Sequence, residues 1–363
     1  MNRILVKSVN WVGDAVLATP TLRILRRAFP DAHLTVMARP WVAPVFEANP
    51  DVDRLWVAEE NKSLRIFREI AARLRKEKFD LGIALPNSFG AALLMAMGRV
   101  KRRIGYNRDG RGLLLTDRVQ ATNEILRAHQ VEYYLHLLRG VCEVDAQPRE
   151  LVLPEAPGAA EHVLGILEKH GLGEAIRQGV PLAGICPGAT YGAAKRWHPD
   201  RFAAVADHLA RKWNARVLVV GSHGERAIAE EIRGHAKTPI SVLSGEIPLR
   251  DLIALCGRLR VFVTNDSGAM HVAAARGAPI VAVFGPTDWV TTAPYHPGAI
   301  IVRKEGVCPK APCLERHCPL ERHVCMDKVG VLDVIEAVDR QMEQNKDEGG
   351  RMKAEGGRMN EEG

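Results

Sequence analysis

The sequence has few aromatic residues and no long apolar run, and each absence excludes a class of protein. Aromatic residues make up 5% of the 363 residues, which argues against a stacking platform for single-stranded nucleic acid. No apolar run reaches the roughly 20 residues that span a bilayer. The N-terminal RILVKSV has no secretory h-region or cleavage site. We therefore expect a cytoplasmic protein.

Cysteine is sparse except in one segment. Four of the seven cysteines lie in CPKAPCLERHCPLERHVC, as Cys308, Cys313, Cys318 and Cys325. This spacing is looser than the paired C-x2-C of most zinc sites, so structural zinc is a minority interpretation. Free thiols in a proline-rich loop are the alternative, because a reducing compartment disfavours disulfides.

The basic excess is confined to the first half of the chain. Residues 1–150 hold 24 Lys+Arg against 17 Asp+Glu, whereas residues 151–363 hold 26 of each. A basic half favours an anionic partner, which is nucleic acid, a phosphate-bearing substrate or an acidic membrane surface. A solvated surface rich in lysine and arginine accounts for the charge equally well.

Short β-branched runs alternate with amphipathic helical patterns, and this alternation occurs twice. The pattern predicts an α/β protein with two doubly wound, Rossmann-like domains facing a central cleft, where ligands bind beyond the carboxyl ends of the strands. A Pro/Gly/Ala-rich linker at 153–161 separates domains 1–154 and 155–328. A helix over 329–344 follows, and the polar segment 345–363 is expected to be a disordered tail. Strands are predicted at 3–9, 33–38, 52–57, 80–85, 182–186, 215–220, 261–264 and 279–284.

The stretch NWVGDAVLATP places Asp14 after a glycine and before a helical pattern. Aspartate is a good helix N-cap, and its charge suits the positive end of a helix. Alternatively, the carboxylate faces a cleft and accepts a proton. The local pattern is compatible with both.

Two stretches of the second domain are typical of anion binding. In CPGATYGAAKRW a buried strand ends in a small-residue loop, and Lys195 supplies a mobile cation. The loop lacks the G-K-[ST] ending of a Walker A motif. In VTNDSGAMHV a strand ends at Asp266, and Ser267 and Gly268 begin a helix whose N–H groups can hold an anion. His271 lies one turn further and is a ligand contact or, alternatively, a core histidine.

The stretch 85–119 is rich in arginine. Asn87 and Ser88 end a predicted strand, and Arg99, Arg102, Arg103, Arg108, Arg111 and Arg118 follow with Lys101. Substrate phosphates would suit this cluster, and a solvated helical face is the alternative.

These stretches, with RIGYNRDGRGLLLTDRV and NDSGAMHVAAARGAPIVAVFGPTD, resemble the bacterial lipopolysaccharide heptosyltransferases of glycosyltransferase family 9. The resemblance covers the chain up to its tail and implies the GT-B fold. LPNSF and PGATYGAAKRW most resemble the members that add the second heptose. The resemblance also makes 329–344 the candidate helix that returns to the N-terminal domain.

The resemblance implies a role for each matching residue. Asp14 corresponds to the general base, and Lys195 to the contact with the donor diphosphate. Further donor contacts are implied for Thr190, Tyr191, Glu225, Asp266, Ser267, Gly268 and His271. Acceptor contacts are implied less directly for Asn10, Trp11, Asn87, Arg103 and Arg111.

The implied reaction moves L-glycero-D-manno-heptose from ADP-heptose to heptosyl-Kdo2-lipid A with inversion. No cofactor is required, because the donor motifs hold no D-x-D metal pair. The partners are ADP-heptose, the phosphorylated Kdo/heptose lipid A acceptor and, peripherally, the anionic inner face of the inner membrane. No nucleic acid is expected. The alternatives are a different acceptor, Kdo or another core sugar, and a non-catalytic nucleotide-sugar binder.

Overall fold

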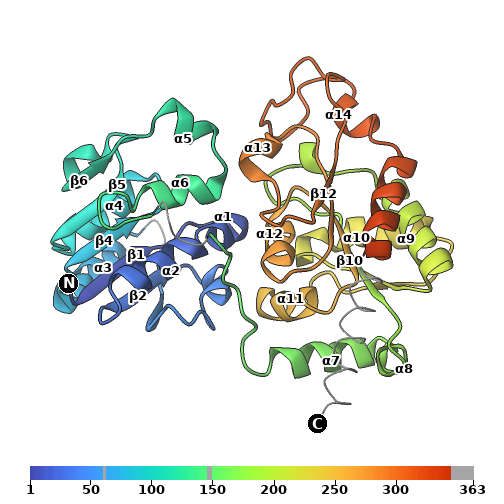
Figure 1. Cartoon of the computed structure of the whole chain (residues 1–363), viewed down its shortest axis with the longest axis horizontal. Coiled ribbons are helices and arrows are strands. Elements are labelled where there is room, and N and C mark those ends of the chain that lie inside the picture. Colours follow the sequence, from blue (N-terminus) through green and yellow to red (C-terminus); the bar gives the residue numbers. More distant parts are fainter. Residues whose placement is uncertain (60–62, 145–148, 345–363) are drawn as a thin grey trace, which may run out of the picture. The chain divides into compact units, whose positions relative to one another are not determined.

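The chain divides into two compact units, Met1–Ala156 and Pro157–Gly363. The computed structural model describes residues 1–59, 63–144 and 149–344. Each unit is a parallel sheet with helices packed against it (Figure 1). The predicted disordered tail, 345–363, lies outside the described residues.

The first unit contains a six-stranded sheet in the order β3-β2-β1-β4-β5-β6, with all neighbouring strands parallel. Sequential strands first extend the sheet in one direction and then, from β4, in the other. Chain order therefore reverses between β1 and β4, which is the place where ligands bind in open α/β sheets. The strands are β1 (Arg3–Lys7), β2 (His33–Ala38), β3 (Arg54–Val57), β4 (Leu81–Ala84), β5 (Arg102–Tyr106) and β6 (Asp117–Val119).

The helices of the first unit bury apolar stripes against this sheet. In α3, Ile70, Ala71 and Leu74 face a core that includes Leu5 and Phe79, as the i, i+4 spacing of apolar residues predicts. Truncating a buried leucine such as Leu74 would cost about 2–5 kcal/mol. The helical segments are α1 (Val12–Leu17), α2 (Thr19–Ala28), η1 (Ala43–Val45), α3 (Leu64–Glu77), α4 (Phe89–Met97), η2 (Arg111–Leu114), α5 (Asn123–Arg127) and α6 (Gln130–His136).

The second unit repeats the same arrangement. Its six parallel strands have the order β12-β11-β10-β7-β8-β9, so chain order reverses between β7 and β10. The strands are β7 (Leu182–Cys186), β8 (Arg216–Val219), β9 (Ile240–Val242), β10 (Val261–Asn265), β11 (Ile280–Val283) and β12 (Ile300–Val302).

One face of the second sheet is covered by α9, α10 and a helix over residues 331–344. Val334, Ala337, Val338 and Met342 of that last helix are buried in the same core as Phe202 of α9. The helix therefore packs in the core of the second unit. The expectation that it also crosses back to the first unit stays a prediction. The other helical segments are α7 (Ala159–Lys169), α8 (Gly173–Arg177), η3 (Ala193–Lys195), α9 (Pro199–Trp213), η4 (His223–Glu225), α10 (Arg226–His235), α11 (Leu249–Cys256), α12 (Gly268–Ala275), α13 (Trp289–Thr292) and α14 (Val324–Asp327).

The α/β class with two doubly wound units is confirmed, but four strands escaped the sequence pattern. β6, β9 and β12 are edge strands of three residues each, too short to show a periodicity. β5 lies inside the sheet, yet it begins with Arg102 and Arg103 and belongs to the arginine-rich stretch whose sequence suggests a phosphate site or a solvated helical face. A carboxylate partner allows a charged side chain in this strand, because Asp117 on β6 accepts a hydrogen bond from Arg102 at 2.7 Å.

Candidate active site

Asp14 lies in the first turn of α1, just beyond the end of β1. The N-cap of this helix is Trp11, which makes no side-chain capping bond, so Asp14 is not the capping residue. Negative charge in a first turn is still favoured by the helix dipole. The carboxylate therefore occupies the edge of the sheet at the point where chain order reverses, and is partly exposed there.

The Asp14 carboxylate has a buried partner in Tyr134 of α6, a helix that packs against α1. Burial raises the pKa of Tyr134 well above its usual range, and the charge of Asp14 and its hydrogen bond to the phenol raise it further. The phenol is therefore neutral near pH 7 and donates to the carboxylate. Such a bond fixes the orientation of the Asp14 carboxylate.

A cavity of about 280 Å³ opens at the same edge of the first sheet. Lys7 from the end of β1, Arg39 from just beyond β2, and Asn10 supply its polar wall, and α3 and α4 supply an apolar wall. Lys7 is only 2% exposed. Sequence reasoning missed Lys7 and Arg39 because each follows an apolar run and reads as the end of a strand. What could have identified both residues is their position at the carboxyl ends of neighbouring parallel strands.

The arginines predicted to touch the acceptor are bonded within the first unit. Arg111 is fully buried, and its guanidinium donates to the carbonyls of Tyr106 and Pro86 and to Oδ1 of Asn87. Burial lowers the pKa of Arg111. Arg103 donates to the carbonyls of Leu114 and Val100. These bonds give both arginines a structural role, and their contact with the acceptor stays a prediction.

Lys195 and Asp266 form an ion pair at the corresponding edge of the second sheet. The Lys195 Nζ lies 2.7 Å from Oδ2 of Asp266, and the two side chains are 13% and 6% exposed. Lys195 ends η3, which follows β7, and Asp266 follows β10. The pair therefore joins the loops after the two strands between which chain order reverses, which is where ligands bind in open α/β sheets. The donor contacts of both residues stay a prediction.

Asn265 ties the same two loops together beneath this pair. Its Nδ2 donates to the Pro187 carbonyl at 2.7 Å, and its Oδ1 accepts from the backbone N–H of Trp197 at 3.0 Å. A buried side-chain amide bonded at both ends holds a loop firmly, because breaking it leaves polar atoms unsatisfied. Sequence reasoning assigned no role to Asn265, although it directly precedes Asp266.

The helix α12 begins beside Asp266. Ser267 is its N-cap, and the Ser267 hydroxyl accepts from the N–H of Met270 at 3.4 Å. The other N–H groups of the first turn and the helix dipole favour a bound anion. His271 is buried one turn along α12, so both predicted features, a helix start and a nearby histidine, occur together here.

Glu225 lies in the same region, against the loop that follows β7. Its carboxylate accepts from the backbone N–H and the hydroxyl of Ser222, each at 2.8 Å. A Cβ on Gly188 would lie 1.9 Å from Oε1 of Glu225, so glycine alone allows this approach. Burial raises the pKa of Cys186 to about 12, and the charge of Glu225 contributes. The thiol is therefore neutral and inert near pH 7.

The loop 187–195 is held on its outer side by the segment 303–323. The Tyr191 hydroxyl donates to the Leu314 carbonyl at 2.7 Å, and the Ala194 N–H donates to the Arg316 carbonyl at 3.0 Å. Lys195 Nζ lies 5.0 Å from the centre of the Tyr191 ring, a favourable cation–π arrangement. Thr190, also predicted to contact the donor, is exposed on this loop.

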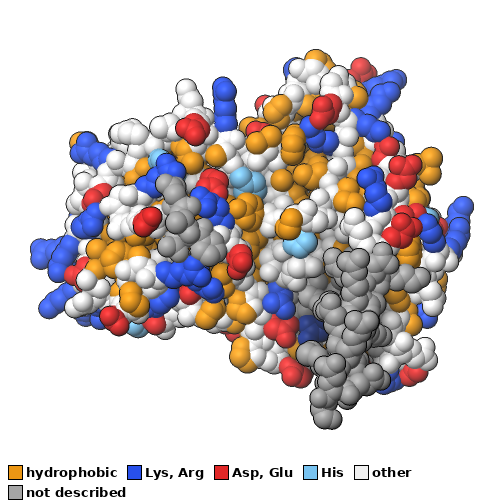
Figure 2. All heavy atoms as spheres, viewed as in Figure 1, with side chains coloured by type: hydrophobic (Ala, Val, Ile, Leu, Met, Phe, Trp, Pro, Cys, Tyr) orange, Lys and Arg blue, Asp and Glu red, His pale blue; other side chains and the backbone are white. Residues whose placement is uncertain are grey.

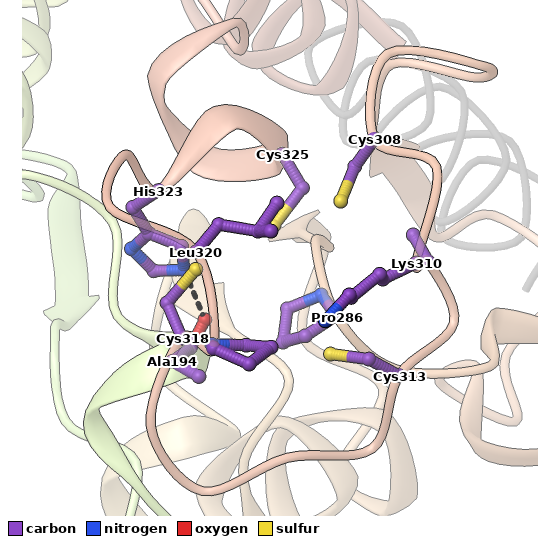
Figure 3. Close-up of a pocket in the computed structure, with 11 residues that line it drawn as sticks. Ala194, Pro286, Cys308, Lys310, Cys313, Cys318, Leu320, His323 and Cys325 are labelled. Carbon is purple, nitrogen blue, oxygen red and sulfur yellow. Dashed lines mark hydrogen bonds between the residues drawn. The ribbon is translucent and has the colours of Figure 1, made fainter.

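Four of the six cysteines of the second unit, Cys308, Cys313, Cys318 and Cys325, line one small pocket with His323 (Figure 3). All seven cysteines are free thiols. Burial, together with the neighbouring thiols, raises the pKa of Cys325 to about 11. Within residues 1–59, 63–144 and 149–344, no group of three or more His, Cys, Asp or Glu is arranged to hold a metal ion.

Positive side chains on the visible face of the first unit are interspersed with negative ones (Figure 2). The ion pairs of the first unit include Arg23 with Asp51 and Lys101 with Asp80. Trp11 and Trp41 are 46% and 54% exposed, and the Trp41 indole donates to the Asn10 carbonyl.

In the part of the chain that the structure describes, no helix combines the length and the apolar character needed to cross a membrane.

Comparison with known proteins gives one family. The profile of glycosyltransferase family 9 (heptosyltransferase) matches residues 67–323. The chain is 31% identical over 312 residues to lipooligosaccharide heptosyltransferase 2 of Haemophilus ducreyi, covering 83% of this chain and 88% of the relative. The structure of ADP-heptose LPS heptosyltransferase II from E. coli is 28% identical, with a TM-score of 0.79, covering 95% of this chain and all of the other. E. coli heptosyltransferase WaaC with ADP is 17% identical, with a TM-score of 0.68 and 93% and 99% coverage, and shares the fold.

Two doubly wound units, matched over 95% of the chain by a heptosyltransferase structure, give the GT-B fold, and the family match gives the glycosyltransferase class. The chain belongs to glycosyltransferase family 9, the heptosyltransferases.

Proposed function

We propose that this enzyme transfers L-glycero-D-manno-heptose from ADP-heptose to the first heptose of the lipopolysaccharide inner core, with inversion. The observation that carries the proposal is the buried Lys195–Asp266 pair beside the start of α12. It offers a cation and backbone N–H groups to a diphosphate and a carboxylate to sugar hydroxyls. Relatives named heptosyltransferase 2, aligned over 83% of the chain, support the choice of sugar and step.

In the donor site, Lys195 and the first turn of α12 bind the diphosphate. One N–H of the Lys195 ammonium serves Asp266, and the group has three donors in all. Glu225 contacts the nucleoside, and Asp266 and His271 contact the heptose. Charge that develops on the leaving ADP is stabilised by dipoles and a cation already in place.

Asp14 is the general base. As the acceptor oxygen attacks the anomeric carbon, the acceptor O–H bond breaks and its proton passes to the Asp14 carboxylate. The bond from the anomeric carbon to the diphosphate oxygen breaks on the opposite face, and ADP leaves with that electron pair. The support is the position of Asp14 at the reversal point of the first unit and its fixed orientation by Tyr134. The arrangement parallels an inverting glycosidase in which an acceptor hydroxyl replaces water.

The acceptor binds to the first unit. Its anionic groups, phosphate or the carboxylate of Kdo, bind in the cavity that Lys7, Arg39 and Asn10 line. The apolar wall formed by α3 and α4 packs against the ring carbons. A cavity of about 280 Å³ lies just under the lower end of typical small-molecule sites, so it suits one sugar with its substituent.

We also propose that the enzyme works in the cytoplasm, peripherally on the anionic inner face of the inner membrane. The basic first half and the exposed Trp11 and Trp41 support this location, since cations and interfacial tryptophans favour such surfaces. Co-sedimentation with vesicles of anionic lipid should fall as salt rises. Equal binding to neutral vesicles would contradict an electrostatic association.

The test of function is transfer by purified enzyme from ADP-heptose to two acceptors, one carrying a single heptose and one carrying none. We expect ADP release and product with the heptosylated acceptor alone. Transfer to the unheptosylated acceptor would assign the first-heptose step instead. Binding of ADP-heptose without transfer to either acceptor would favour a different core-sugar acceptor. If no core-sugar acceptor reacts, the chain would be a non-catalytic protein that binds the nucleotide sugar.

A further inference from the structure

The segment 303–323, between β12 and α14, contains no helix or strand. Irregular connections longer than about 12–15 residues are uncommon in compact domains and usually functional. Cys308, Cys313 and Cys318 are half-buried within this mostly exposed segment, and Cys325 is buried at the start of α14. Thiols thus share the interior of the segment with a few small or apolar side chains such as Pro319 and Leu320. A small irregular element with so little apolar core needs another source of order, such as a metal or a disulfide.

The four thiols surround one pocket, and the size of this pocket limits which ligand it can hold. Their sulfur atoms are directed toward its interior (Figure 3). The space that a water-sized sphere can occupy there is about 10 Å³, which is about one such sphere. A sugar or a nucleotide does not fit this volume, whereas a single ion does.

We propose that Cys308, Cys313, Cys318 and Cys325 bind one divalent transition-metal ion through four thiolates. Four sulfur ligands are typical of a tetrahedral site for a soft or borderline ion of the Zn²⁺ class. Each thiol transfers its proton to solvent as its sulfur binds. Lys310 also lines the pocket, and its ammonium offsets part of the negative charge of the complex.

His323 is not assigned to the ion, because its Nε2 lies 2.7 Å from the Ala194 carbonyl and is used in that hydrogen bond. The sulfurs do not yet stand at metal-ligand spacing in the described residues. Binding therefore requires the segment to contract until each sulfur is about 2.3 Å from the ion. Three of the four cysteines lie in irregular backbone, where such a movement breaks no helix or strand.

A bound ion would act beyond the segment itself. Leu314, Arg316 and His323 hold the loop that carries Tyr191 and Lys195. The contact is close, because a Cβ on Gly192 would lie 2.2 Å from the Arg316 carbonyl oxygen. Fixing the segment thus fixes the donor loop. This consequence, unlike metal binding itself, rests on the proposed function.

The first experiment measures metal in the full chain, purified under reducing conditions without chelators. We expect about one zinc or iron ion per chain by elemental analysis, and Co²⁺ added to the metal-free protein should give the thiolate-to-cobalt absorption of a tetrahedral site. Co²⁺ absorption without sulfur character, or titration showing that the native protein neither contains nor takes up metal, would overturn the proposal. Two disulfides among the four cysteines, found by mass spectrometry, would also overturn it.

The variants are Cys308→Ser and Cys313→Ser, with Cys142→Ser as the control, since Cys142 is half-buried in the first unit and outside the segment. We expect the first two to lose at least about 10-fold in metal affinity and the control to bind normally. If the variants do not fold, the unsubstituted chain can be treated with a thiol reagent with and without Zn²⁺. We then expect Zn²⁺ to protect four of its thiols from reaction. Metal removal should also weaken ADP-heptose binding about 10-fold. Unchanged donor binding would reject the coupling and leave the metal site standing.

Discussion

The two units share a strand order but carry different side chains at the point where chain order reverses. In the first unit this edge holds the carboxylate of Asp14 and a cavity with two cations, Lys7 and Arg39. In the second it holds the Lys195–Asp266 pair and the start of α12. A parallel sheet therefore determines where a ligand binds, and the loops after its strands determine which ligand.

The difference between the loops also explains the division of labour we propose. A general base must be oriented so that its carboxylate reaches the acceptor hydroxyl, and the buried phenol of Tyr134 orients Asp14 in this way. Asp266 instead lies beside the ammonium of Lys195, a cation suited to a diphosphate. The two aspartates are thus suited to different roles.

The largest effect is expected from removing the base. Asp14→Asn keeps the size and the helical position but cannot accept the proton, so turnover should fall about 100-fold or more. The dissociation constant for ADP-heptose, measured by calorimetry, should stay within about 2-fold because Asp14 belongs to the acceptor unit. Asp31→Asn, an exposed position of the same unit, is the control. Full turnover in the Asp14 variant would remove the proposed distinction between the two aspartates.

The next largest effect is expected in the second unit. Lys195→Ala removes the cation and leaves Asp266 as a buried unpaired carboxylate, so ADP-heptose affinity should fall about 10- to 100-fold. The matched control is Lys212→Ala, which breaks a lysine–aspartate pair of 2.9 Å with Asp339 on the outside of the same unit. An equal loss in both variants would indicate general destabilisation rather than lost phosphate contact.

The comparison of the two units also shows what the sequence could predict. Asp14, Lys195 and Asp266 could be placed beyond the carboxyl ends of strands because β1, β7 and β10 have strongly apolar sequences. Lys7 and Arg39 were missed because their place in the site depends on which strands are neighbours, and strand order is a tertiary property. Arg111 illustrates the reverse case: its residue type suggests a ligand contact, yet the fold buries it among carbonyls.

A third prediction concerns the cationic cavity. Arg39→Ala should raise the KM for the heptosylated acceptor about 10-fold, the cost of losing a hydrogen bond from a charged donor. The KM for ADP-heptose should be unchanged, which would separate the two units kinetically. Arg65→Ala, an exposed position on α3 that pairs with Glu69, serves as the control. An increase in the donor KM would show that the cavity does not serve the acceptor alone.

The smallest effect is on stability and belongs to the first unit. The Asp80 carboxylate accepts from Lys101 and from the N–H groups of Asn2 and Arg3, and chiefly the Lys101 bond lowers its pKa to about 2. A lowered folded-state pKa stabilises the fold at pH values above the unfolded pKa, and this stabilisation is lost as pH falls toward the folded value. Because Lys101 is largely exposed, solvent screening reduces the contribution to about 1 kcal/mol.

Asp80→Asn should therefore lower the free energy of unfolding at pH 7 by about 1 kcal/mol, measured by urea denaturation. The difference from the unsubstituted chain should shrink as pH falls from about 4 toward 2, because there the Asp80 carboxyl of the unsubstituted chain takes up a proton in the unfolded state before it does so in the folded state. ADP-heptose affinity at pH 7 should not change, since Asp80 bonds to Asn2, Arg3 and Lys101 at the amino ends of β1 and β5, at the edge of the first sheet opposite the carboxyl ends. A difference that persists undiminished at low pH would assign the loss to packing rather than to charge, and a change in donor affinity would show that the units are less independent than their separate sites imply.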